Sequence, residues 1–210
     1  MRVKNGARWL TACLEAQYFC DHIIVLDDNS TDATAGICRQ MGVEYYRKPF
    51  DAGYDEGTDR EILAVMATAY NPEWICSMDA DEVLMADTWD KIKGPICDPS
   101  VPVIEILNLN LWDEPDQVRT DEPWGNQYRQ RFWRFKSGKL TYAADHCSLP
   151  NEITERPFTR TGAMLHYGYM KSGDRIRRYD RYRNMGHNWP TIIQTEGIIL
   201  TPLADVCAKL

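Results

Sequence analysis

The sequence lacks a long apolar run, a CxxC pair and an excess of positive charge. No stretch approaches the roughly 18 consecutive apolar residues of a membrane-spanning helix, and the first residues have no apolar segment typical of a signal peptide. The seven cysteines show no zinc or redox spacing. The formal net charge of −7 disfavours broad contact with nucleic acid. These absences predict a cytoplasmic protein with reduced thiols and no transmembrane segment.

The length and composition of the chain are those of a small globular protein. It has 210 residues, of which 44% are hydrophobic and 26% are charged, and no internal repeat is visible. A chain of this size can bury a substantial core within one domain. Because the sequence pattern changes near residue 100, we expect one domain built from two halves, residues 1–100 and 101–210.

The first half alternates helical and extended patterns. We predict helices over residues 7–17, 32–41 and 60–69, and strands over residues 22–26, 43–46 and 74–78. This alternation indicates an α/β fold with a Rossmann-like, mostly parallel sheet flanked by helices. In such sheets, ligands bind beyond the carboxyl ends of the strands.

The second half is richer in strands and predicts a small mixed β region. We expect strands over 101–111, 129–135 and 162–169, a loop over 112–116 and a helix over 172–185. Three tryptophans of this half have two interpretations: they form a platform for a sugar ring, or they pack this half against the sheet. They are Trp112, Trp124 and Trp133.

One acidic cluster follows the apolar strand 74–78. It consists of Asp79 and Asp81, with Glu82 beside them. Two carboxylates one residue apart in a turn can share a divalent cation, and that cation can bridge a diphosphate. The alternative is a set of turn-forming and helix-capping carboxylates. The position after a buried strand favours the metal site.

A second acidic cluster, Asp27 and Asp28, ends the strand 22–26. A carboxylate at this place can accept hydrogen bonds from a nucleobase or a ribose, whereas the alternative is that both residues only cap the next helix. Because the two clusters both follow strands, the pair of them favours a binding site.

Three sequence blocks together resemble the family 2 glycosyltransferases. They are RVKNGARWL at residues 2–10, IIVLDDNSTDAT at residues 23–34 and WICSMDADE at residues 74–82. The resemblance implies a GT-A fold in which residues 1–100 bind a nucleotide-sugar and residues 101–210 bind the acceptor. It also implies metal-dependent transfer of a sugar from a UDP- or GDP-type donor to the hydroxyl of a saccharide or other acceptor, usually with inversion.

The resemblance assigns a role to each matching position. Asp28 would contact the nucleobase, with Asp27 beside it. Asp79 would contact the ribose, and Asp81 would bind the metal, Mn²⁺ or Mg²⁺. Arg60 would lie near the nucleotide and its phosphates.

A further metal ligand and the general base are expected in the second half. His166, near the end of the strand 162–169, is the assigned ligand because imidazole suits Mn²⁺. His146 is the alternative. The base must be a carboxylate that reaches the acceptor hydroxyl, and Asp145 is the assigned residue. The other candidates for the base are Asp121, Glu122 and Asp174.

The helix 172–185 carries five arginines. Such runs are usually solvated faces, and this interpretation is favoured over binding of the donor diphosphate or of an anionic acceptor. The arginines are Arg175, Arg177, Arg178, Arg181 and Arg183.

Other functions stay open as alternatives. The residue after Asn5 is usually acidic in the family, whereas here it is Gly6, which motivates a pseudoenzyme that binds nucleotide-sugars without turnover. A related nucleotidyltransferase would have a glycine-rich loop with a basic residue after its first strand, which residues 5–8 match poorly. A nucleic acid would be a partner only as a modified base that receives the sugar.

Overall fold

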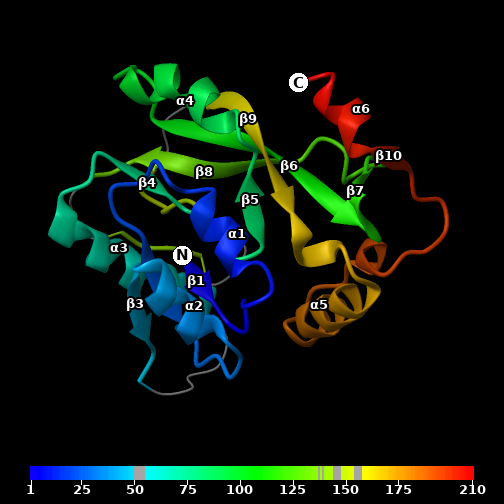
Figure 1. Ribbon diagram of the computed structural model, residues 1–210, viewed down its shortest axis with the longest axis horizontal. Helices are drawn as coiled ribbons and strands as arrows, with labels where there is room; N and C mark the ends of the chain where they lie inside the picture. The colour runs from blue at the N-terminus through cyan, green and yellow to red at the C-terminus, as the bar shows by residue number, and fades with distance from the viewer. Residues whose placement is uncertain (50–54, 137, 139, 144–147, 154–157) are drawn as a thin grey trace.

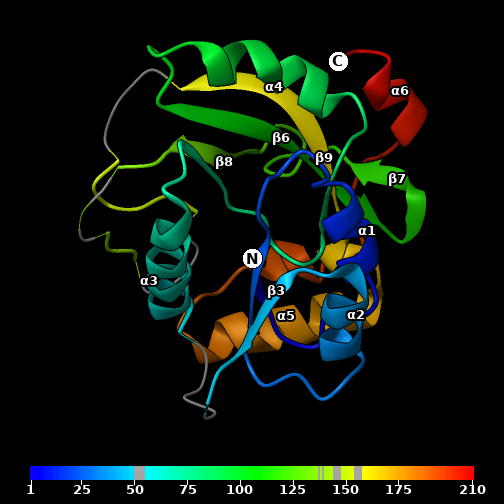
Figure 2. The ribbon, with the colours of Figure 1, turned by 60° about the vertical axis from the view of Figure 1, so that its left-hand side comes forward.

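The computed structural model describes residues 1–49, 55–136, 138, 140–143, 148–153 and 158–210. Its N-terminal part is a three-stranded parallel sheet in the order β1-β2-β3 (Figure 1). The strands are β1 (Arg2–Val3), β2 (Ile24–Asp27) and β3 (Glu44–Arg47). Helix α3 (Glu56–Ala67) lies on one side of β3 and α2 (Thr34–Met41) on the other, with α1 (Leu10–Glu15) packed against α2 (Figure 2).

The second sheet has seven strands and mixed directions. Its path runs β10-β7-β6-β8-β4, and β9 pairs with both β6 and β5. The bounds are β4 (Trp74–Cys76), β5 (Glu82–Leu84), β6 (Val103–Trp112), β7 (Glu114–Arg119), β8 (Tyr128–Arg134), β9 (Thr159–His166) and β10 (Leu200–Pro202). All ten residues of β6 are buried, because β8 and β9 pair with its two edges and its side chains pack into separate core clusters.

The remaining helices surround this second sheet. They are α4 (Thr88–Cys97), α5 (Ser172–Asn184) and α6 (Leu203–Cys207), with short 3₁₀ turns at Thr68–Tyr70, Tyr167–Tyr169 and Pro190–Ile192. Helix α4 packs on β9, and α6 packs on β7 near the C-terminus (Figure 1). Among the helices that the structure describes, none has the length and apolar composition needed to cross a bilayer.

Local sequence signals explain the ends of the helices near the site. Gly42 closes α2 in the left-handed conformation, with φ of 68° and its N–H on the carbonyl of Arg39. Asp55 caps α3 by accepting the N–H of Thr58 at 2.9 Å. This cap lets α3 begin at Glu56, earlier than the predicted residue 60.

Three tryptophans of the second half belong to the core. Trp112, Trp133 and Trp124 are at most 5% exposed, so the packing interpretation is confirmed and the sugar platform is wrong. The six cysteines in the described ranges are free thiols, as expected. Cys13 and Cys38 are buried, whereas Cys97 is exposed.

The sheet arrangement corrects the sequence analysis in two places. The predicted strand 74–78 is shorter, and as β4 it pairs antiparallel with β8 instead of joining the parallel sheet. The mixed region is therefore larger than expected. The predicted loop 112–116 is a tight turn at Asp113 between β6 and β7, where φ of 64° reverses the chain.

Candidate active site

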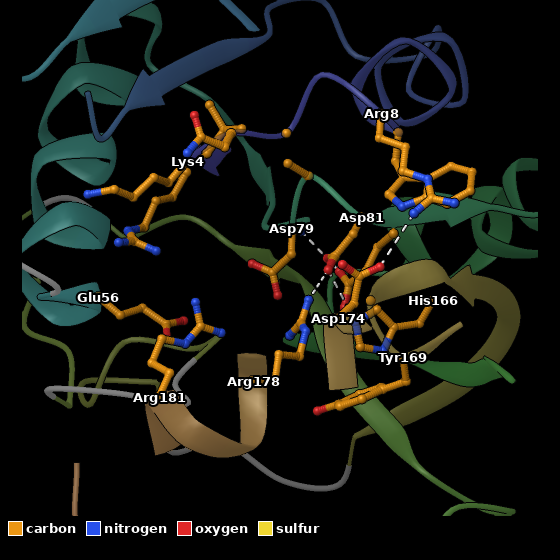
Figure 3. Close-up of a pocket in the computed structure, with 18 of the residues that line it drawn as sticks. Lys4, Arg8, Glu56, Asp79, Asp81, His166, Tyr169, Asp174, Arg178 and Arg181 are labelled. Atoms are coloured by element: carbon orange, nitrogen blue, oxygen red, sulfur yellow. Dashed lines mark hydrogen bonds and ion pairs between the residues drawn. The ribbon is translucent and has the colours of Figure 1, made fainter. Parts of the chain in front are cut away.

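The carboxyl ends of β1, β4 and β9 border one cavity of about 550 Å³. Its other walls come from the β1–α1 loop, α3, β8 and α5 (Figure 3). Among the described residues that line it, nine are Arg or Lys and five are Asp or Glu. The cavity is therefore positively charged, although the whole chain has a net charge of −7. Such a cavity suits an anionic ligand.

Asp79 lies between two arginines at the edge of this cavity. Its Oδ1 accepts a hydrogen bond from Arg60 at 2.9 Å, and its Oδ2 accepts one from Arg131 at 3.2 Å. Desolvation in the cavity would raise the pKa of Asp79, but Arg131 and Arg60 outweigh it and lower the pKa to about 2. Asp79 is therefore an ionised acceptor at neutral pH. The position of Arg60 is fixed further by Glu56, at 2.9 Å.

Glu82 is the buried support of the Asp79 segment. It is 2% exposed and forms an ion pair with Arg131. Its second oxygen accepts the backbone N–H of Asp79 at 3.0 Å. Burial raises the pKa of Glu82 in spite of the positive charge of Arg131. The pair thus fixes the backbone that presents Asp79 and Asp81.

Asp81 faces the opposite wall of the cavity. Its Oδ2 forms an ion pair with Arg178 of α5 and lies 3.7 Å from Nε2 of His166. Burial would raise the pKa of Asp81, but Arg178 and His166 outweigh that effect and hold the pKa well below its usual range. Arg178 can come this close to Asp81 because residue 168 is glycine. A Cβ at that position would overlap both side chains.

The orientation of His166 follows from β6. Its Nδ1 lies 2.9 Å from Oδ1 of Asn110, an oxygen that also accepts the side-chain amide of Asn108 at 3.1 Å. Because that oxygen is an acceptor, Nδ1 of a neutral His166 carries the proton and Nε2 keeps its lone pair. The lone pair is directed to the side of Asp81, as a metal-binding imidazole requires.

Asp28 lies beneath the cavity floor. It is 1% exposed, and its carboxylate pairs with Arg2 at 2.9 Å and with Lys48 at 3.3 Å. Lys4 lies 3.5 Å from the same group. Arg2 and Lys4 line the cavity, whereas Asp28 does not. Contact of Asp28 with a nucleobase stays a prediction, and it would require these cations to move aside.

Asp27 has a local structural role. It is fully buried; its Oδ1 accepts the N–H of Ser30 at 2.8 Å, and its Oδ2 accepts the hydroxyl of Tyr45 at 2.5 Å. The turn that it closes holds the β1–α1 loop, because Ser30 accepts the N–H of Asn5 at 2.8 Å. These contacts fit the alternative of a turn-forming carboxylate. The predicted place of Asp27 beside the nucleobase stays a prediction.

The sequence also matches a known family over most of its length. The model of the family described as "Glycosyl transferase family 2" matches residues 2–154. The chain belongs to this family. With the family shown, the expected α/β fold of the GT-A type is confirmed, apart from the sheet details corrected above.

The curated relatives of this family 2 chain are distant and longer. An uncharacterized protein of Mycobacterium tuberculosis is 27% identical over 212 residues, which cover 86% of this chain and 48% of the relative. An uncharacterized glycosyltransferase of Rickettsia felis is 32% identical over 89 residues, which cover 42% of this chain and 29% of the relative. The chain therefore spans about half or less of the length of these relatives.

Solved structures of glycosyltransferases resemble the chain in part. TarS of S. aureus has a TM-score of 0.48 at 15% identity, with 63% of this chain and 45% of TarS covered. The mannosyltransferase PcManGT of Pyrobaculum calidifontis, solved with GDP-Man and Mn²⁺, has a TM-score of 0.41 at 20% identity, with 51% and 34% covered.

The candidates for the general base of this family 2 protein fall into three groups. Asp145, the assigned base, lies outside the described residues, as does His146, the alternative metal ligand. Asp121 does not line the cavity. It accepts a hydrogen bond from Arg119 at 2.8 Å, and this hydrogen bond lowers the pKa of Asp121. Glu122 does not line the cavity either. Asp174 does, at the beginning of α5.

The predicted metal ligands Asp81 and His166 come together. Their side chains are 3.7 Å apart, close enough to share one cation. Within the described residues, no three His, Cys, Asp or Glu side chains surround a common point. One carboxylate and one imidazole would fit a divalent cation that takes its remaining ligands from phosphate oxygens and water.

The sequence analysis missed several partners in the site. Arg131 and Glu82 were not assigned, although basic residues at alternate positions of the strand 129–135 were a usable signal. Asp59 is fully buried and pairs with Arg2 at 2.5 Å and Lys48 at 2.7 Å.

The arginines of helix α5 do not all lie on a solvated face, contrary to our expectation. Arg175 is 6% exposed and binds Asp113 at 2.7 Å, and Arg178 reaches Asp81. Arg177, Arg181 and Arg183 are exposed. The favoured interpretation is therefore wrong for Arg175 and Arg178, which face the protein.

Replacement of Gly168 by Ala is expected to destabilise the protein by about 1 kcal/mol, the low end of the usual cost of overpacking, because the atoms that the methyl would meet are the ends of two side chains. The reason is that the added methyl would overlap the Arg178–Asp81 pair. Urea unfolding followed by fluorescence measures the change. Gly173→Ala is the matched control, since a Cβ there meets only Arg177 at 3.5 Å. Equal unfolding midpoints for the two variants would contradict the close approach at Gly168.

Proposed function

We propose that this chain is the donor-binding and catalytic part of a glycosyltransferase that moves a sugar from a nucleoside-diphosphate sugar to an acceptor hydroxyl. The observation that supports this most is the meeting of Asp79, Asp81 and His166 in one basic cavity of a family 2 chain. The diphosphate of a UDP- or GDP-sugar is the anion that such a cavity suits.

In this proposal, the donor lies in the cavity with its nucleoside at one end and its sugar at the other. The nucleoside lies at the side of Lys4 and Glu56, with Asp79 on the ribose and Arg60 near the phosphates. Figure 3 places Asp79 and Asp81 between Lys4 and Arg8, so the transferred sugar extends past Asp81.

Asp81 and His166 would hold Mn²⁺ or Mg²⁺. A bound cation neutralises the charge that develops on the departing diphosphate. Arg178, which forms an ion pair with Asp81, is placed to bind phosphate oxygens as well.

The acceptor side completes the reaction. Transfer would proceed with inversion: the acceptor hydroxyl attacks the anomeric carbon and a carboxylate takes the hydroxyl proton, while the bond from that carbon to the diphosphate breaks and the nucleoside diphosphate leaves. Asp145 is the base in this proposal, because Asp174, which also lines the cavity, is paired with Arg8 and Arg177.

Calorimetric titration with UDP and with GDP tests the proposal. We expect one nucleotide to bind in the presence of Mn²⁺ and to bind at least roughly tenfold more weakly with a chelator, because the cation bridges Asp81 and the diphosphate. Release of that nucleotide from its sugar donor is then measured in the presence of candidate acceptors. Asp180→Asn on the exposed side of α5, outside the cavity, is the control for both assays.

Two outcomes would contradict the proposal. Absence of binding for both nucleotides, in protein with a cooperative unfolding transition, would remove the donor site. Metal-dependent binding without release of nucleotide from any sugar donor would support the pseudoenzyme instead.

A further inference from the structure

Four of the arginines that line the cavity are matched by buried or partly buried carboxylates. Arg60 pairs with Glu56 and Asp79, Arg131 with Glu82 and Asp79, and Arg178 with Asp81. Arg2 pairs with Asp28 and Asp59. Each of these arginines is at most 22% exposed. The positive charges of these four arginines are therefore engaged in ion pairs that hold the donor end of the site in place.

Arg8 and Arg177 are different. Their side chains are 50% and 75% exposed, and they share one carboxylate, that of Asp174. Arg8 lies 3.5 Å from Asp174, and Arg177 forms an ion pair with the other oxygen of the same group. Two guanidinium groups and one carboxylate leave one positive charge at this end of the cavity.

Arg8 lies on the far side of Asp81 from the place proposed for the nucleoside. In Figure 3, Arg8 lies on one side of Asp81, whereas Lys4 and Glu56 lie on the other side, beyond Asp79. A diphosphate with its divalent cation has almost no net charge, so the donor does not need the extra positive charge near Arg8. This positive charge is therefore available to the acceptor.

Arg8 is also held in place before any ligand arrives. Its guanidinium lies 4.6 Å above the ring of Trp9, and Trp9 stacks on Tyr167 with ring centres 4.3 Å apart. Arg8 comes from the β1–α1 loop and Arg177 from α5, so the two residues approach Asp174 from different walls. Planar guanidinium groups in such an arrangement suit the oxygens of a phosphate or a carboxylate.

We propose that the acceptor carries an anionic group, a phosphate or a carboxylate, and that Arg8 and Arg177 bind it next to the transferred sugar. This inference rests on the proposed function, since it assigns the substrate class of the same site. The neutral hydroxyl that receives the sugar and the anionic group belong to one molecule. Asp174 then serves to position the two arginines.

The test compares three sugars on protein saturated with UDP or GDP and Mn²⁺. Glucose, glucose 6-phosphate and glucuronate are titrated by calorimetry at low salt, so that the two anions separate a phosphate preference from a carboxylate preference. We expect one of the anionic sugars to bind at least roughly tenfold more tightly than glucose. Arg8→Gln and Arg177→Gln should each remove most of that difference and leave nucleotide binding unchanged.

Arg183→Gln is the matched control, because Arg183 is an exposed arginine of the same helix outside the cavity. Equal binding of the three sugars would overturn the inference, and so would an equal loss in Arg183→Gln, which would indicate general electrostatic attraction. If Arg8→Gln and Arg177→Gln lower only the unfolding temperature, the Asp174 group is a structural link and the inference fails.

The experiments distinguish failure of the proposed function from failure of the anion site. If neither nucleotide binds, the same titrations on nucleotide-free protein still report on Arg8 and Arg177. Tight binding of an anionic sugar that these two variants abolish would keep the anion site while removing the donor site. Normal nucleotide binding by the parent protein with equal binding of the three sugars would remove the anion site alone.

Discussion

Replacement of Asp81 by Asn is expected to lower the rate of sugar transfer by roughly a thousandfold. The cation that Asp81 would hold supplies several kcal/mol of charge stabilisation to the departing diphosphate, and about 1.4 kcal/mol corresponds to a factor of ten in rate. Asn keeps the shape of the side chain but is a much weaker ligand. The backbone carbonyl of residue 81 still accepts the N–H of Tyr167, at 2.9 Å in the present structure, so the variant should fold.

Nucleotide titration separates this effect from a general loss of binding. The parent protein should bind its nucleotide more tightly with Mn²⁺ than with a chelator, whereas Asp81→Asn should bind equally in both conditions. Asp180→Asn should behave as the parent does. Metal-dependent binding retained in Asp81→Asn would show that the cation is held elsewhere, and near-normal transfer would remove Asp81 from the mechanism.

The strands that carry the acidic clusters could be predicted because their signals are local. An apolar run that ends at Asp27 reads as a strand with a polar end, and the same holds for the run before Asp79. Gly42 marks the end of α2 in the same way. The α/β class and the place of the acidic residues at strand ends follow from such signals alone.

The partners of those acidic residues could not be predicted, because they come from distant parts of the chain. Arg178 is 97 residues from Asp81, and Arg131 is 49 residues from Glu82. Within helix α5 every arginine looks alike in the sequence, and only packing against the turns at Tyr167–Tyr169 and Pro190–Ile192 selects Arg175 and Arg178 for the inner face. The pairing of β4 with β8 is likewise a tertiary choice that no local pattern contains.

Replacement of Arg131 by Met is expected to destabilise the protein by about 3–5 kcal/mol, because it leaves the buried carboxyl group of Glu82 without an opposite charge. Arg131 is 4% exposed and Glu82 is 2% exposed, so water cannot replace the lost charge. Arg131 also donates to Ser148 at 2.7 Å and to Asp79 at 3.2 Å. For a chain of this size, the unfolding temperature should fall by roughly 10 °C.

Two further variants decide whether the lost ion pair is the cause. Arg129→Met removes an exposed arginine of the same strand that bonds Gln127 at 3.2 Å, and it should change the stability by less than about 1 kcal/mol. The double variant Glu82→Leu with Arg131→Met should recover part of the loss, since an apolar pair leaves no unpaired charge in the core. A double variant no more stable than Arg131→Met would mean that the contacts of Arg131 with Ser148 and Asp79 carry the stability. A loss of the same size in Arg129→Met would mean that strand β8 is sensitive at every position, and that Glu82 is not the reason.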